Sequence, residues 1–182
     1  MTAPDDLLAL LEKAAGDETG LPPVHQWQPK READVAIRIG RDGRWYYQDS
    51  PIERQRMVNL FSTILLREGE DFFLITPVEK LRIQVDDAPF VAVEVEQVND
   101  GEDVKLVFRT NVGTHVVAGP QHPIRVHIDD NTGEPSPYLL VRDNLEALIS
   151  RNVFYQLVEW GTEQGELLMI RSGGTAFELG SL

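Results

Sequence analysis

Cysteine is absent from this chain of 182 residues. Disulfide bonds, thiolate nucleophiles, and zinc or iron–sulfur sites with cysteine ligands are therefore excluded. Basic residues are also scarce, with 17 lysines and arginines against 30 aspartates and glutamates and a formal net charge of -13. Because so acidic a surface repels the phosphates of nucleic acids and of anionic membranes, we expect neither as a partner.

The sequence near the N-terminus has no long apolar run. The run from Leu7 to Leu11 is too short to cross a bilayer. It follows Asp5 and Asp6, whereas a secretory signal carries lysine or arginine at this place. We therefore predict a cytoplasmic protein of the bacterial type.

Spacings typical of metal, cofactor or catalytic sites are missing too. His122 and His127 are an odd number of residues apart, so in an extended strand their side chains point to opposite faces. Gly173 and Gly174 precede a strand, whereas a phosphate-binding loop precedes a helix. We predict no metal and no cofactor, and the sequence favours a non-enzymatic protein over an enzyme, although a catalytic site built from residues distant in sequence would leave no spacing signal.

Residues 1–32 are predicted to form a short helix and an extended linker. Four leucines between residues 7 and 11 recur at helical spacing after two aspartates, and Gly16 ends the pattern. From there to Pro29 the chain is rich in glycine, proline and polar residues, with Val24 and Trp27 as the expected anchors.

Residues 33–86 are predicted to form a first α+β subdomain. Apolar residues alternate where strands are expected and recur every three or four residues where a helix is expected. The predicted elements are strands at 35–39, 45–47, 72–76 and 81–85 and a helix at 51–67. Ser50, Pro51 and Glu53 have the pattern of a capping box at the start of this helix.

Residues 87–182 are predicted to form a second α+β subdomain by the same criteria. The predicted elements are strand-like segments within 90–119, strands at 123–128, 138–141, 167–170 and 175–179, and a helix at 144–160. Asp143 and Glu146 have the same positions at the start of this helix as Ser50 and Glu53 have at the start of the first. The sequence thus predicts two similar β-β-α-β-β units, each a helix packed on a curved antiparallel sheet, with extra strands before the second unit.

An ordered series of short motifs resembles the bacterial family of unknown function DUF1285. The motifs are GRWYYQDSPIER at 43–54, TPVEK at 76–80, the Asp-x-Ala-Pro-Phe that ends at Phe90, Thr110-Asn111, HPIR at 122–125, Val141-Arg142, Arg151 and Phe154-Tyr155. The similarity runs from about Leu21 to the C-terminus. It implies an α+β protein of two similar subdomains, with a groove between them that binds a ligand and a role in signal transduction. Asp49 departs from the family pattern, which has glycine there.

Arginines are the first candidates for a ligand site in so acidic a chain. Arginine binds carboxylates and phosphates through two parallel hydrogen bonds, which suits a small anionic ligand. The alternative is that each arginine pairs with a neighbouring acidic residue. Arg54 is expected on the flank of the first helix, where it borders a groove. The candidates in the second unit are Arg125, Arg142 and Arg151, and Tyr155 lies one turn after Arg151.

Three further candidate groups complete the predicted ligand site. Trp45 and Tyr47 share one face of their strand, where they either stack on a planar ligand or pack in the core. The resemblance implies roles for Glu79, Lys80 and Asn111, although a Glu-Lys pair in a turn is usually solvated surface.

These observations favour a non-enzymatic small-ligand-binding or sensory module, holding a small anionic or planar molecule between its two repeats. The alternative is a protein–protein interaction adaptor that presents exposed strand edges or aromatic residues such as Trp45 and Trp160 to a partner. An exposed apolar patch of several hundred square ångströms would favour the adaptor.

Overall fold

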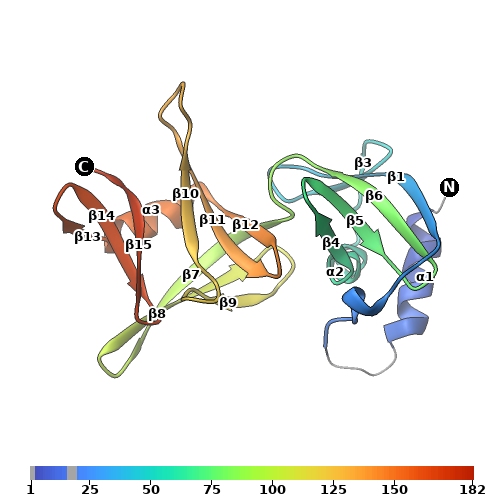
Figure 1. Cartoon of the computed structure of the whole chain (residues 1–182), viewed down its shortest axis with the longest axis horizontal. Helices are drawn as coiled ribbons and strands as arrows, with labels where there is room; N and C mark the ends of the chain where they lie inside the picture. Colours follow the sequence, from blue (N-terminus) through green and yellow to red (C-terminus); the bar gives the residue numbers. More distant parts are fainter. Residues whose placement is uncertain (1–2, 16–19) are drawn as a thin grey trace. The chain divides into compact units, whose positions relative to one another are not determined.

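The computed structural model describes residues 3–15 and 20–182, which divide into two compact units, Met1–Asp87 and Ala88–Leu182 (Figure 1). The first unit begins with the predicted helix, α1, at Pro4–Ala15, whose first turn contains Asp5 and Asp6. Leu7 is buried, and α1 packs against a second helix of the same unit. The predicted end of α1 at Gly16 lies outside the described residues.

A short connection leads from α1 to the first sheet. The described part of this segment contains one turn of 3-10 helix, η1, at Val24–Gln26. Val24 is buried and Trp27 is half-buried, as expected of anchors.

The first unit is built on a six-stranded sheet in the order β3-β2-β1-β6-β5-β4. Its strands are β1 (Arg31–Ile39), β2 (Trp45–Tyr47), β3 (Ser50–Pro51), β4 (Leu65–Glu68), β5 (Asp71–Ile75) and β6 (Glu79–Val85). The central strands β1 and β6 run parallel, and the other neighbours are antiparallel. Helix α2 (Gln55–Ser62) connects β3 to β4 and buries Met57, Val58 and Phe61.

The predicted start and length of the first helix are wrong. Ser50 and Pro51 pair with Tyr47 and Tyr46 as strand β3, and α2 begins only after Arg54, which makes no side-chain cap. The predicted capping box of Ser50, Pro51 and Glu53 therefore does not form. A two-residue hairpin turn at 48–49 takes these residues into the sheet, and residues 65–68 continue as strand β4.

The turn between β2 and β3 explains why the family pattern has glycine at the position of Asp49. Gln48 and Asp49 have φ angles of 48° and 64°, which is the backbone of a type I′ hairpin turn and favours glycine. Since a left-handed backbone is strained for aspartate, we expect Asp49→Gly to raise the free energy of unfolding by about 0.5 kcal/mol. Urea denaturation measures this change. The control, Ser50→Gly in a strand without positive φ, should lower stability, and a loss in both variants would contradict the prediction.

The second unit contains another six-stranded sheet, in the order β10-β11-β12-β7-β8-β9. Its strands are β7 (Phe90–Asp100), β8 (Asp103–Thr110), β9 (His115–Val117), β10 (Ile124–Ile128), β11 (Pro135–Arg142) and β12 (Leu145–Ile149). Helix α3 (Arg151–Trp160) follows, and then a three-stranded sheet of β13 (Thr162–Gln164), β14 (Leu167–Ser172) and β15 (Thr175–Ser181).

The predicted start of the second helix is also wrong. Residues 145–149 form strand β12, in which Leu145, Ala147 and Ile149 are buried in alternation. Asp143 has a φ of 50° and lies in the turn before this strand, so it does not cap a helix. The pattern at 145–149 has the period of two that marks a strand, and α3 begins only after Ser150.

The two large sheets share one topology. If the strands of each unit are numbered from one to six along the chain, both sheets have the order 3-2-1-6-5-4 with strands one and six parallel at the centre. This confirms the α+β class and the two similar units. The helices are not equivalent, because α2 connects the third and fourth strands of its sheet whereas α3 follows the sixth. The extra strands lie at the C-terminus rather than before the second unit.

Ser172 joins the small sheet to the large sheet of the second unit. Its buried hydroxyl donates to the carbonyl of Ala118 and accepts from the N–H of Leu106, both at 2.8 Å. The next residue, Gly173, donates its N–H to the carbonyl of Val104 at 3.0 Å. One side chain thus satisfies two backbone groups of the neighbouring sheet.

Candidate functional site

The ten predicted site residues are divided between the two units. Trp45, Tyr47, Arg54, Glu79 and Lys80 belong to the first unit, and Asn111, Arg125, Arg142, Arg151 and Tyr155 belong to the second. A pocket of the first unit brings Tyr47 and Arg54 together, and none of the other eight residues lines it.

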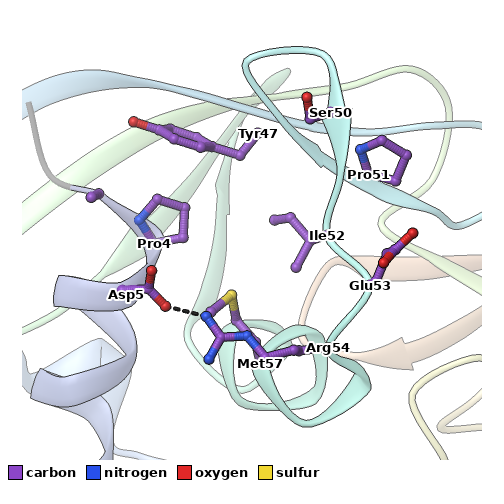
Figure 2. A pocket seen from close by; sticks show the side chains of 10 residues that line it. Pro4, Asp5, Tyr47, Ser50, Pro51, Ile52, Glu53, Arg54 and Met57 are labelled. Atoms are coloured by element: carbon purple, nitrogen blue, oxygen red, sulfur yellow. Dashed lines mark hydrogen bonds and ion pairs between the residues drawn. The ribbon is translucent and has the colours of Figure 1, made fainter.

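This pocket is a hollow of about 400 Å³ beside the first turn of α1 (Figure 2). Strands β2 and β3 and the residues that lead into α2 form most of its wall. The lining residues are Ala3, Pro4, Asp5, Tyr47, Ser50, Pro51, Ile52, Glu53, Arg54 and Met57. The volume lies within the range of about 300 to 1,000 Å³ that is usual for small-molecule sites.

The pocket combines an apolar interior with a charged rim. Met57 is buried on α2, Tyr47 and Ile52 are half-buried, and their side chains lie around the hollow (Figure 2). The Arg54 guanidinium points toward α1, where Nη2 donates a hydrogen bond to the Asp5 carboxylate. The two side chains are 63% and 75% exposed, so solvent screens this ion pair.

Trp45 packs in the core and does not line the pocket. Its side chain is 2% exposed, and its ring centroid lies 6.2 Å from that of Phe61 on α2. None of the residues that the structure describes accepts a hydrogen bond from the buried indole N–H. Of the two interpretations of Trp45 and Tyr47, core packing describes Trp45, whereas Tyr47 contributes to the pocket wall.

Glu79 and Lys80 are held by contacts within the first sheet. Glu79 opens strand β6, is 4% exposed, and has its Oε2 3.7 Å from Nε of Arg31. Lys80 Nζ lies 2.7 Å from Oε2 of Glu68 and 4.3 Å from the centroid of the Phe73 ring. The expectation of a solvated Glu-Lys turn is therefore wrong for Glu79, because β6 begins two residues earlier than the predicted strand at 81–85.

The side chains of Asn111 and Arg125 both hydrogen-bond to other residues of the second unit. Asn111 Oδ1 accepts from the N–H of Val91 at 3.0 Å, and the Asn111 N–H donates to the Val91 carbonyl at 2.9 Å. Arg125 donates two hydrogen bonds of 2.7 and 2.8 Å to Glu146 and lies over the Tyr138 ring at 4.3 Å. Arg125 therefore pairs with a neighbouring acidic residue, which is the alternative to ligand binding that the sequence left open.

Two arginines of the second unit have shifted pKa values. The Arg109 guanidinium hydrogen-bonds to Glu94 and holds the pKa of that carboxyl below its usual value, and Glu94 raises the pKa of Arg109 in turn. This pair therefore contributes stability at neutral pH that is lost as the pH falls through the lowered pKa of Glu94. Burial lowers the pKa of Arg142, whose guanidinium lies 5.3 Å from the centroid of the Phe90 ring, and the Asp143 carboxylate opposes this shift.

Arg151 and Tyr155 lie one turn apart on the exposed face of α3. Tyr155 is 63% exposed, and Val158, in the next turn, is also exposed. Among the residues that the structure describes, no three histidine, aspartate or glutamate side chains come together to hold a metal ion. Within the same part of the chain, no helix is long and apolar enough to cross a membrane.

Asp5 is one of the pocket residues that the sequence does not predict as part of a site. Its contact with Arg54 joins residues 49 positions apart. The sequence places Asp5 only at the start of a helix, where an aspartate is expected for its effect on the helix dipole. The local sequence pattern does not indicate the direction in which α1 docks on the unit.

Comparison with known families and structures defines the class of this protein. Models of the N-terminal and C-terminal domains of DUF1285, a family of unknown function, match residues 22–88 and 89–179. The chain therefore belongs to the DUF1285 family, which confirms the resemblance. No curated protein matches the chain.

Two crystal structures of bacterial DUF1285 family proteins are similar to this chain. The protein from Silicibacter pomeroyi DSS-3 is 48% identical, with a TM-score of 0.86 over 97% of this chain and 95% of that one. The protein from Shewanella baltica OS155 is 29% identical, with a TM-score of 0.54 over 69% of this chain and 91% of that one.

Proposed function

We propose that this protein is a non-enzymatic small-ligand-binding or sensory module of the bacterial cytoplasm, and that it takes part in signal transduction. The pocket of the first unit is the proposed binding site. The observation that carries the proposal is the hollow of about 400 Å³ in which the ring of Tyr47 and the apolar side chains of Ile52 and Met57 lie next to the Arg54 guanidinium. This pocket lies wholly within the first unit, so the proposal does not depend on a groove between the repeats.

The chemistry of the lining supports a small anionic or planar ligand. An apolar interior with few polar groups at its edge is the usual composition of a small-molecule site. Tyr47 and Pro51 offer flat surfaces to a planar molecule, and Arg54 offers hydrogen-bond donors to an acidic group. In a chain of net charge -13, Arg54 places a guanidinium beside the apolar hollow, in a lining that also contains the carboxylates of Asp5 and Glu53.

A ligand screen on the full chain tests the proposal. Small anionic and planar compounds are added to ¹⁵N-labelled protein, and the amide resonances are followed by NMR. We expect at least one class of compound to shift the resonances of residues 50–57 without shifting the second unit. Ile52→Glu, which places a charge in the pocket, should abolish the shifts.

The matched control is Val78→Glu, which adds the same charge at an exposed position outside the pocket lining. This variant should bind as the wild type does. Shifts that persist in Ile52→Glu, or the failure of every compound to shift residues 50–57, would contradict the proposal.

A protein-interaction adaptor is the second candidate function, and the exposed face of α3 favours it. Arg151, Tyr155 and Val158 follow one another along this face, and tyrosine and arginine are frequent anchors of interfaces. Two apolar side chains fall short of the patch of roughly 300 to 600 Å² that usually marks an interaction site. The pocket therefore supports ligand binding better than α3 supports docking.

A further inference from the structure

The pocket of the first unit already contains a carboxylate at its rim. Asp5 reaches from the first turn of α1 and accepts a hydrogen bond from Nη2 of Arg54. We infer that Asp5 occupies the place of an acidic group of the ligand, and that the pocket takes a small apolar monocarboxylate. This inference rests on the proposed function and names the ligand class for the same site.

A ligand carboxylate can replace the Asp5 carboxylate in the contact with Arg54. Both side chains are mostly exposed, and an ion pair of this kind is weak because water and salt screen it. A ligand carboxylate gains the same hydrogen bonds from Arg54. Its apolar body also fills the hollow beside Ile52 and Met57, a gain that the short side chain of Asp5 does not provide.

The charges around the pocket favour one negative charge on the ligand. Among the described residues, the lining contains two carboxylates, Asp5 and Glu53, and one cation, Arg54. When a ligand takes the place of the Asp5 carboxylate on Arg54, both Asp5 and Glu53 stay near it, and the Arg54 guanidinium neutralises one negative charge of the ligand. A dianion such as a phosphate monoester adds a second repelled charge, so a carboxylate binds better than a phosphate.

Ligand binding then changes the attachment of α1. Leu7 is buried and α1 packs against α2, so these contacts keep the helix on the unit when Asp5 is released. The first turn of α1 loses its ion pair, and its amide protons exchange faster with solvent. Occupancy of the pocket is thereby transmitted to the N-terminal segment of the chain.

Benzoate is a suitable probe, since it joins one carboxylate to a planar apolar ring. Its affinity is measured by NMR titration for the full-length wild type and for Asp5→Asn, Asp6→Asn and Arg54→Gln. We expect Asp5→Asn to bind benzoate about three- to fivefold more tightly, because the internal competitor is gone. Arg54→Gln should bind benzoate at least about tenfold more weakly than the wild type, because a hydrogen bond to a charged group is lost.

Asp6→Asn is the matched control for Asp5→Asn. Asp6 lies in the same turn and loses the same charge, but it does not line the pocket. Its affinity should change less than about twofold. Benzamide, which has the shape of benzoate without its charge, and phenyl phosphate should both bind more weakly than benzoate.

Equal affinities of the wild type, Asp5→Asn and Asp6→Asn would overturn the inference, as would benzamide binding as tightly as benzoate. If other compounds of the wider screen bind the pocket while no carboxylate does, the ligand class is wrong and the proposed function stands. If no compound binds in any variant, the proposed function fails and this inference fails with it. Circular dichroism of Arg54→Gln establishes that the exposed substitution leaves the fold intact.

Discussion

Ser172→Ala is expected to destabilise the second unit by roughly 2 to 4 kcal/mol. The substitution removes a hydroxyl that serves both the N–H of Leu106 and the carbonyl of Ala118. Both backbone groups belong to buried residues, so water does not replace the lost partner without opening the structure. Urea denaturation followed by far-UV circular dichroism measures the loss, with the two units fitted as separate transitions where their midpoints differ.

Hydrogen exchange provides a second, local measure of the same substitution. The amide proton of Leu106 should exchange much faster in Ser172→Ala, because its acceptor has been removed. Ser181→Ala is the control, since Ser181 is exposed at the end of β15 in the same small sheet. Its stability should stay within about 0.5 kcal/mol of the wild type. Equal stabilities of the two variants would contradict a joining role for Ser172.

Trp45→Ala should destabilise the first unit by about 3 to 5 kcal/mol, since it removes a fully packed ring from the core. Trp45→Phe should stay within about 1 kcal/mol of the wild type. The smaller ring leaves a cavity, but the substitution also removes a buried N–H from which no residue in the described part of the chain accepts a hydrogen bond, and these two effects oppose each other. Urea denaturation of both variants measures the difference.

Trp27→Ala is the control for the size of the side chain. Trp27 is half-buried, so its truncation should cost less than that of Trp45. A loss for Trp45→Phe as large as that for Trp45→Ala would show that the indole N–H makes a bond important to the fold. Unchanged stability of Trp45→Ala would show that the ring is not part of the core.

The strands were predictable where apolar and polar residues alternate and a turn signal follows. The hairpin of β1 and β2 and the pair β10 and β11 both have this pattern, so local sequence was sufficient. The helix starts were not predictable in the same way. Residues 50–53 fit a helix cap and a strand equally well, and the left-handed backbone of the turn at 48–49 decided between them.

The candidate site was predictable only in part. Tyr47 and Arg54 are close in sequence, so the hairpin of β2 and β3 and the segment that leads into α2 are enough to bring both to one pocket. Asp5 completes the site from another helix, and its position depends on how Leu7 packs against the rest of the unit. The roles of Arg125 and Asn111 depend equally on contacts between distant strands, which no spacing along the chain reveals.

The parallel pair at the centre of each sheet has a consequence for the order in which the chain can fold. In the first unit β1 is the first strand and β6 the last, so the two halves β3-β2-β1 and β6-β5-β4 join only through this pair. Until β6 leaves the ribosome, β1 presents an open edge and the first half has no partner for it. Each unit is therefore completed by its final strand, and a chain shortened before Val85 would expose an edge that other chains could join.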